Sequence, residues 1–288
     1  MITALIDGDW ILYAAGFAGQ RPEMVCPSLS DKTYANITEI RKDAGDPKLS
    51  PTLVYSRVVM DPESHFYHSA KKMIESQCNK IAEKFGEDVT PIIMTEGDGN
   101  FRSRLATIRP YKGSRHVHAK PLMYNNIRQY LLEAWDAEVI FDQETDDAMA
   151  IRQTELHAAG KKSVIVGVDK DMLQVPGWHL NPNKGFKRIT KAEGEARLYV
   201  QAAMGDAVDN IAGCYKVGPA KAKEVFADLD MSEEDKWDAL VKLYNNSIAK
   251  SGDVYGGLDG TQAALENMRL VYLRRSKGEL WMPPGVRK

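Results

Sequence analysis

The pattern of apolar and polar residues along the chain predicts strands that alternate with helices. Short apolar runs at residues 3–7, 89–95, 137–141 and 162–168 have the length of buried strands. Between them lie stretches with helical character, at residues 10–19, 61–86, 122–135 and 145–160, and several of these begin near Pro or end at Gly. This alternation predicts βαβ units, and therefore an α/β fold with a mostly parallel central sheet flanked by helices.

Two regions depart from this alternation. Residues 20–56 are polar and interrupted by Pro and Gly; a strand or hairpin is predicted near residues 52–60, and no function follows from this stretch. From about Ile189 onward the pattern changes to helices and glycine turns, without a clear strand. We therefore expect an α/β domain over residues 1–190 and a helical subdomain over residues 191–288.

The composition of the chain argues against several classes of protein. The three cysteines, Cys26, Cys78 and Cys214, are far apart and form no C-x-x-C pattern, which argues against a disulfide framework and a zinc site. No apolar run reaches the roughly 20 residues of a membrane helix, and the first residues lack the features of a signal peptide. We expect a cytoplasmic protein without a membrane partner.

The net charge of −2 conceals a strongly uneven distribution. From Gly99 to Leu132 the chain contains no Asp or Glu, but it contains the basic residues Arg102, Arg104, Arg109, Lys112, Arg115, Lys120 and Arg128. Such a run is either a solvated charged face or a surface for a polyanion.

Acidic residues collect where the predicted strands end. Asp7 ends the first strand, Glu96 or Asp98 follows the second, and Asp169 with Asp171 follows the fourth. The helix predicted to start near Thr145 opens with Glu144, Asp146 and Asp147, and "MGDAVDN" supplies Asp206 and Asp209, which share a face if that segment is helical. Because parallel strands end at one edge of a sheet, and the following helices begin there, we expect these acids to converge.

So many carboxylates at one edge would repel each other strongly unless cations neutralise them. Ligand sets of oxygen alone favour Mg²⁺ or Mn²⁺ over zinc, and the size of this set suggests two ions. Two such ions are the usual arrangement for displacement at phosphorus. Any single acid could instead be a helix cap or turn former, and this alternative is strongest for Asp9 and Asp98.

A second element combines glycine, proline and lysine. In "GDAVDNIAGCYKVGPAKAKEVF", Gly213 and Gly218 flank a short turn, and Pro219 begins a new helix with Lys221 and Lys223 close behind. Lysines in a first helical turn oppose the helix dipole, and backbone N–H groups there can cradle a phosphate. The alternative is a plain turn between two helices.

These segments together resemble the 5′-nuclease superfamily. "LIDGDW", "FRSRLATIRPYKGSR", "ETDDAMA", "VGVDKDM" and "MGDAVDNIAGCYKVGPAKA" occur in that family's order and spacing, over about residues 2–227. The opening "DGDW" and the short basic connection are most similar to the 5′–3′ exonucleases of T-odd bacteriophages.

The resemblance implies a PIN-like fold with a metal-dependent phosphodiesterase site and a helix–hairpin–helix-type clamp on duplex backbone. It implies metal-site roles for one acid after the second strand, with Glu96 favoured over Asp98, and for Asp7, Glu144, Asp146, Asp147, Asp169, Asp171, Asp206 and Asp209. "YKGSR" matches the family's "YK-x-x-R", so Lys112 and Arg115 are expected to hold the scissile phosphate. Arg102, Arg104 and Tyr111, together with the turn from Gly213 to Gly218 and its two lysines, are expected to contact nucleic acid, and a K⁺ ion is expected at that turn.

The expected activity is 5′→3′ exodeoxyribonuclease, with flap endonuclease and RNase H-like activity in addition, in phage-type replication or recombination. The substrates would be DNA ends, nicks or flaps and RNA–DNA hybrids, and the partners replication proteins of a host or phage. The segment "HVHAKP" is too short for a long two-helix arch, which favours the exonuclease over a structure-specific flap endonuclease. Two further alternatives are a catalytically silent DNA-binding or scaffold protein and a PIN-type ribonuclease.

Overall fold

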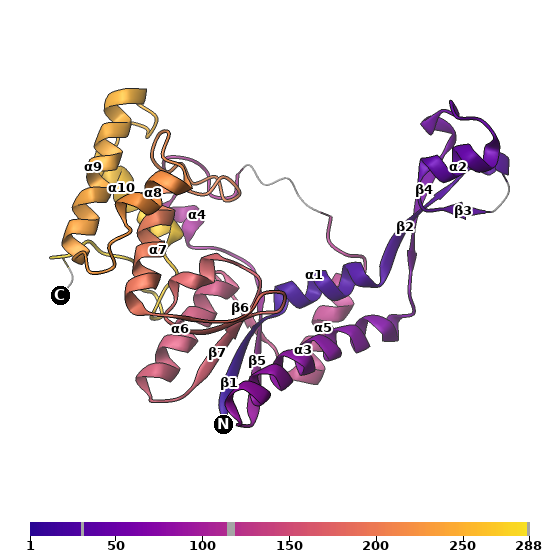
Figure 1. The fold of residues 1–288 in the computed structure, drawn as a ribbon, viewed down its shortest axis with the longest axis horizontal. Helices are drawn as coiled ribbons and strands as arrows, with labels where there is room; N and C mark the ends of the chain where they lie inside the picture. Colours follow the sequence, from indigo (N-terminus) through magenta and orange to yellow (C-terminus); the bar gives the residue numbers. More distant parts are fainter. Residues whose placement is uncertain (30–31, 114–118, 287–288) are drawn as a thin grey trace. The chain divides into compact units, whose positions relative to one another are not determined.

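The computed structural model describes residues 1–29, 32–113 and 119–286 (Figure 1). The chain forms two compact units, each made of several segments. Unit 1 comprises residues 1–9, 76–118 and 136–288, and unit 2 comprises residues 10–75 and 119–135. The domain boundary expected at residue 190 falls within unit 1, and that division stays a prediction.

Unit 1 is built on a six-stranded sheet with the order β6-β5-β1-β7-β8-β9. Its strands are β1 (Ile2–Asp7), β5 (Val89–Glu96), β6 (Glu138–Ile140), β7 (Ser163–Val166), β8 (Gly177–Asn181) and β9 (Gly185–Ile189). All neighbouring strands pair in parallel except β8 and β9, which pair antiparallel. The α/β fold with a mostly parallel sheet is therefore confirmed.

The hairpin of β8 and β9 was not predicted. The parallel strands are nearly continuous apolar runs because both of their faces are covered. β9 is an edge strand with the sequence "GFKRI", in which Lys187 and Arg188 are exposed, so it lacks that signal.

Helix α6 (Thr145–Ala158) packs against the sheet at β1, β5 and β7. Its buried side chains, such as Met149, join Leu5 of β1 and Ile165 of β7 in one apolar cluster. The short helix α4 (Arg102–Leu105) and the 3-10 turn η3 (Asp171–Gln174) also belong to unit 1. The last turns of α3 (Glu63–Phe85) lie in this unit as well, and Phe85 contacts Trp178 edge to face at 5.4 Å.

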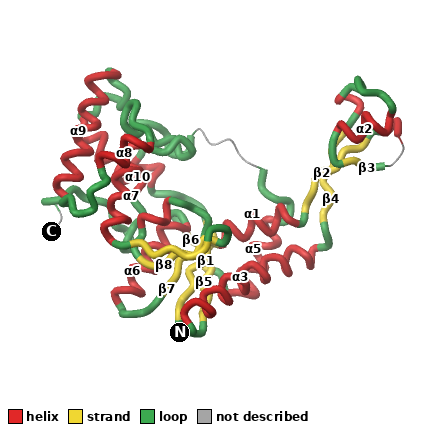
Figure 2. The backbone as a smooth tube through the Cα atoms, in the orientation of Figure 1, coloured by secondary structure: helices red, strands yellow, loops and turns green. Residues whose placement is uncertain are grey.

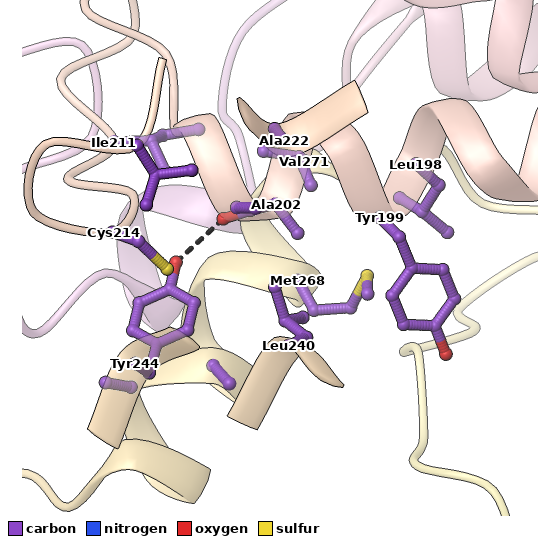
Figure 3. Close-up of a cluster of buried hydrophobic side chains, with 14 of the residues drawn as sticks. Leu198, Tyr199, Ala202, Ile211, Cys214, Ala222, Leu240, Tyr244, Met268 and Val271 are labelled. Carbon is purple, nitrogen blue, oxygen red and sulfur yellow. Dashed lines mark hydrogen bonds between the residues drawn. The ribbon is translucent and has the colours of Figure 1, made fainter. Parts of the chain in front are cut away.

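After β9 the chain is helical, as expected (Figure 2). The helices are α7 (Lys191–Met204), α8 (Pro219–Val225), α9 (Glu233–Ser251) and α10 (Gly260–Val271). Figure 3 shows their shared core, in which Leu198 and Tyr199 of α7 lie with Leu240 of α9 and Met268 of α10. The buried Tyr244 hydroxyl donates to the carbonyl of Ala202 at 2.7 Å, which ties α9 to α7.

Unit 2 contains most of α1 (Gly8–Ala18), the first part of α3, and α5 (Tyr124–Trp135). Aromatic pairs connect these helices: the Tyr13 ring meets that of Tyr124 at 5.5 Å, and Tyr67 stacks on Tyr130 at 4.9 Å. Each pair adds to the burial of apolar surface.

The stretch from residue 20 to residue 60 forms a small folded module within unit 2. Its antiparallel sheet has the order β3-β2-β4, with β2 (Gln20–Val25), β3 (Thr33–Tyr34) and β4 (Tyr55–Met60). It also contains α2 (Ile37–Ala44) and the 3-10 turns η1 (Pro27–Leu29) and η2 (Pro51–Leu53). Cys26, Tyr34, Ile40 and Leu49 form its core. Only the strand near residues 52–60 was predicted here.

Among the described residues, no helix combines the length and apolar character needed to cross a membrane.

Candidate active site

A cavity of about 210 Å³ lies at the edge of the sheet where the parallel strands end. Its lining includes acids that four segments deliver to this edge: Asp7 at the end of β1, Glu96 at the end of β5, Glu144 and Asp146 at the start of α6, and Asp169 and Asp171 after β7. Asp206 and Asp209 line it from the turn after α7. Convergence follows from the parallel pairing, because the strand ends and the helix starts face the same side.

Asp206 and Asp209 reach the cavity from a turn and not from a helix. Asp206 and Ile211 pair through their backbones in an isolated antiparallel β-bridge. The Asp206 Oδ1 atom accepts the N–H groups of Val208 and Asp209, at 2.7 and 3.3 Å. These bonds hold the turn closed and keep both carboxylates at the cavity.

Helix α6 begins at Thr145, where the sequence predicted its start, and Glu144 is its N-cap. The backbone N–H of Glu144 donates to Asp147 Oδ2 at 3.3 Å, so the acid three residues on closes the turn. Thr145 is buried, and it lines the cavity together with Glu144 and Asp146.

The charge in the cavity is only partly compensated. Burial and the neighbouring Asp7 and Asp169 raise the pKa of Asp146 well above its ordinary value. Burial and Asp169 likewise raise the pKa of Asp171. Burial would raise the pKa of Glu144 too, but Arg102 and Lys112 reverse this effect and hold it below the ordinary value.

Two predicted site residues form a buried ion pair instead. Arg102 is 1% exposed and Asp147 is fully buried. The two guanidinium nitrogens Nη1 and Nη2 bind the two carboxylate oxygens, at 2.5 and 2.9 Å. Arg102 also donates to the carbonyls of Leu270 and Tyr272, and the N–H of Arg274 donates to Asp147 Oδ1 at 3.0 Å.

This arrangement differs from the expectation for both residues. Arg102 lines the cavity, but its guanidinium is enclosed and bound within the protein, and its contact with nucleic acid stays a prediction. Asp147 does not line the cavity, and both of its oxygens already accept hydrogen bonds. The pair anchors the start of α6 to α4 and to the chain segment that follows α10.

Of the two alternatives after β5, Glu96 lines the cavity. Asp98 is exposed and is not part of the lining. The strand β5 continues through Glu96, so its carboxylate is placed at the sheet edge directly, whereas Asp98 belongs to the following turn.

Besides Arg102, the residues Tyr111 and Lys112 line the cavity and contact the carboxylates of two of its acids. Lys112 Nζ pairs with Glu144 Oε1. The Tyr111 hydroxyl lies 3.0 Å from Glu144 Oε1 and 3.1 Å from Asp209 Oδ2, and burial raises its pKa. Arg104 is exposed and forms a bidentate pair with Asp142, with both distances 2.7 Å. Arg115 lies outside the described residues.

The glycine turn is present and is tightly packed at one end. Gly213 has φ +60°, and its carbonyl accepts the Tyr255 hydroxyl at 2.8 Å. Gly218 is the N-cap of α8, and the side chains of Lys221 and Lys223 are exposed. The structure therefore presents the two lysines on a short helix next to an anchored turn.

Several lining residues were not predicted. Asp9 was interpreted as a cap, and Thr145 and Gln201 were not considered as part of the site. Leu270, Val271 and Leu273 form part of the wall, although they lie more than 120 residues from Glu144 in the sequence. No local pattern marks these three residues, because their place depends on the path of α10.

Within residues 1–29, 32–113 and 119–286, no group of three or more His, Cys, Asp or Glu side chains has the arrangement of a preformed metal site. The fit of the cavity to a divalent ion therefore depends on its chemistry. Its donors are carboxylate oxygens, which suit Mg²⁺ and Mn²⁺, and burial together with the nearby Asp7 and Asp169 raises the pKa of Asp146.

Comparison with known proteins gives a likeness in structure but not in sequence. No protein-family model matches the chain, and no curated protein sequence matches it. A structure of bacteriophage T5 5′-exonuclease with bound zinc covers 94% of this chain and 89% of its own, with 15% identity and a TM-score of 0.55. A structure of the bacteriophage T5 flap endonuclease, a pseudo-enzyme–product complex with DNA and metal ions, has the same coverage, 14% identity and a TM-score of 0.54. The likeness concerns the architecture: this chain has the fold of the T5 5′-nuclease.

Proposed function

We propose that this protein is a divalent-metal-dependent nuclease that hydrolyses DNA from 5′ ends in the 5′→3′ direction. One observation carries the proposal: carboxylates from five separate segments of the chain line a single cavity at the carboxyl edge of a parallel sheet. Structural roles such as capping would distribute these acids over separate helix ends. Their convergence is the arrangement that phosphoryl chemistry with metal ions requires.

The chain's own residues divide into two groups in this proposal. Asp7, Glu96, Glu144 and Asp146 would hold one Mg²⁺ or Mn²⁺ ion, and Asp169, Asp171, Asp206 and Asp209 a second. When bound, such ions stabilise negative charge that develops on phosphate oxygens and lower the pKa of water.

Lys112 would bind and orient the scissile phosphate. It lines the same cavity as the acids and its side chain pairs with one of them, so its charge is held at the cavity rather than in solvent. Arg115 would assist it, on the basis of the "YKGSR" motif. Tyr111 would contact the end of the strand, since its ring borders the cavity.

Binding of duplex backbone is assigned to the turn from Gly213 to Gly218, with Lys221 and Lys223 and a K⁺ ion. Replacement of each lysine by Ala should weaken DNA binding across all sequences and reduce the slope of log K against log salt by about one. Fluorescence anisotropy with labelled duplex at several salt concentrations measures both effects. A slope that stays unchanged in both variants would remove this assignment.

The T5 structures support a second candidate activity, flap cleavage. One T5 structure is described as that of a 5′-exonuclease, and another as that of a flap endonuclease in a complex with DNA. We extend the proposal to RNase H-like cleavage of RNA–DNA hybrids, to a setting in phage-type replication or recombination with host or phage replication proteins, and to the cytoplasm.

Side-by-side digestion tests the activity. Linear duplex, nicked, flap and hybrid substrates with a labelled 5′ end are incubated with Mg²⁺, with and without EDTA. Release of 5′-phosphorylated mononucleotides from linear duplex supports the exonuclease, whereas release of the intact flap supports the second candidate. Binding of DNA without cleavage of any substrate would favour the silent DNA-binding protein, and preference for single-stranded RNA the PIN-type ribonuclease.

A further inference from the structure

Asp9 joins three chain segments at the rim of the cavity. It lies in the first turn of α1, and its carboxylate is part of the cavity lining. Its Oδ2 atom accepts the backbone N–H of Glu96 at 3.0 Å and the hydroxyl of Thr145 at 2.9 Å. A single oxygen therefore connects the end of β5 and the first residue of α6 to the start of α1.

Both hydrogen bonds of Asp9 reach chain segments that carry acids of the proposed function. Glu96 is itself one of these acids, and Thr145 separates Glu144 from Asp146 along the chain. The carboxylates of Glu96, Glu144 and Asp146 line one cavity, and like charges held that close repel each other. Hydrogen bonds to a carboxylate are among the strong ones in proteins, so Asp9 can hold these segments together against that repulsion.

From this geometry we propose that Asp9 is a positioning residue, which fixes the Glu96 backbone and the opening turn of α6 so that their acids face one ion site. The inference depends on the proposed function, because it names how the chain prepares the acids of that site. Asp9 acts here through the hydrogen bonds of Oδ2 and not as a ligand of the ion.

A simple capping role for Asp9 makes a different prediction. The dipole of α1 favours any acid in the first turn, whether or not that acid contacts Glu96 and Thr145. Replacement of Asp9 would then weaken α1 but leave the Glu96 amide and the metal affinity unchanged. The two roles can thus be separated by measurements at the partners.

The Glu96 amide is the first readout. Its hydrogen exchange is followed in wild type, Asp9→Ala and Asp9→Asn without metal, and Asp88→Ala, an exposed acid at the other end of β5, is the control. Asp9→Ala should raise the exchange rate by about tenfold, because one hydrogen bond is lost. Asp9→Asn should retain most of the protection, since an amide oxygen can accept the same bonds. An unchanged rate in Asp9→Ala overturns the proposal.

The second readout is metal binding, measured from the electron paramagnetic resonance signal of free Mn²⁺. Asp9→Ala should weaken the Mn²⁺ affinity by about 10- to 100-fold, as is usual when a residue that orients metal ligands is removed. Asp9→Asn should stay within about threefold of wild type, and Thr145→Val should lose affinity while Thr145→Ser retains it. If Asp9→Asn loses as much as Asp9→Ala, the negative charge is what matters, and the positioning role is wrong.

DNA cleavage separates this inference from the proposed function. With an active wild type, Asp9→Ala should lower kcat by a similar factor with little change in KM for DNA. A wild-type protein that neither binds Mn²⁺ nor cleaves DNA would contradict the proposed function, and the exchange of the Glu96 amide would still decide whether Asp9 positions β5.

Discussion

At the scale of single residues, Arg102 shows how one motif can carry a role that the sequence does not reveal. Its place in "FRSRLATIRPYKGSR" led us to expect contact with nucleic acid. The structure instead encloses its guanidinium between Asp147 and the carbonyls of Leu270 and Tyr272. Arg104, two residues further along, has its charge at the surface with Asp142. The two arginines differ in burial, and burial decides the strength of their ion pairs.

Replacement of Arg102 by Met should destabilise the protein by about 3–5 kcal/mol, because it leaves the buried Asp147 without a counter-charge. Arg104→Met, in the same short helix, should change stability by at most about 1 kcal/mol, since its pair is exposed. Urea unfolding followed by circular dichroism measures both. Equal effects of the two substitutions would contradict the structural role given to Arg102.

Unlike Arg102, whose charge is paired with that of Asp147, Asp146 is buried beside charges of its own sign. Its pKa is raised in the folded protein by burial and by Asp7 and Asp169, so its ionised form is less favourable there than in the unfolded chain. The folded state therefore binds the proton more tightly, and stability falls as pH rises from the ordinary pKa of 3.8 toward the raised value.

In the presence of EDTA, Asp146→Asn should raise the melting temperature at neutral pH and flatten its decline with rising pH. With Mg²⁺ and DNA, the same variant should lose at least about 100-fold in cleavage rate, because a group that serves the transition state is missing. Glu155→Gln, an exposed acid on the same helix, is the matched control for both measurements. A lower melting temperature for Asp146→Asn in EDTA would refute the electrostatic account.

At the scale of elements, the turn between α7 and α8 combines a packed end and an open end. At Gly213 an added Cβ would lie 2.1 Å from the Met204 carbonyl oxygen, and φ is +60°. At Gly218 nothing lies within 4 Å of such an atom, and φ is −90°. The first glycine is therefore required by the backbone, whereas the second leaves the space before α8 open.

We expect Gly213→Ala to lower stability by at least about 2 kcal/mol, because the backbone conformation and the close approach both exclude a side chain. Gly218→Ala should stay within about 0.5 kcal/mol of wild type. Thermal unfolding of the two variants tests this contrast. Since Gly218→Ala keeps the fold, a loss of DNA affinity in that variant would reflect the turn's surface rather than its stability.

At the scale of the whole molecule, the acids of the cavity become neighbours only through the fold. β1 and β7 are 155 or more residues apart in the sequence, yet they pair side by side and carry Asp7 and the loop of Asp169 to one edge. The concentration of charge that results is the basis for expecting divalent ions, which would stabilise the folded chain as well as support the reaction.

Mg²⁺ should therefore raise the melting temperature of the wild-type protein, by an amount that corresponds to about 2.7 kcal/mol at 100 times its dissociation constant. EDTA should abolish cleavage while the circular dichroism spectrum stays that of a folded protein. The double variant Asp146→Asn with Asp171→Asn should show little further stabilisation by Mg²⁺. Full stabilisation of that variant would place the ions somewhere other than this cavity.

The sequence by itself determined the sheet and most of the acids. Residues 162–168 form an apolar run because both faces of β7 are covered, so this strand and its parallel neighbour β1 could be recognised from the local pattern. Their parallel pairing followed from the intervening helices. Once the strands were parallel, the positions of Asp7, Glu96 and Asp146 at one edge followed from topology alone. The β8–β9 hairpin was missed, and so was the module from residue 20 to residue 60 apart from the strand near residues 52–60, because strands such as β2 and β9 carry exposed polar residues and lack the apolar signal.

Only the tertiary structure decided which charges are buried and which are open. The two neighbouring aspartates of "ETDDAMA" have different surroundings. Asp146 lines the cavity, whereas Asp147 forms an ion pair with Arg102, because successive residues of a helix face different directions. The contact of Asp9 with Glu96 and Thr145 likewise spans 87 and 136 residues. Burial and such distant contacts depend on how the whole chain packs, and no local pattern in the sequence contains them.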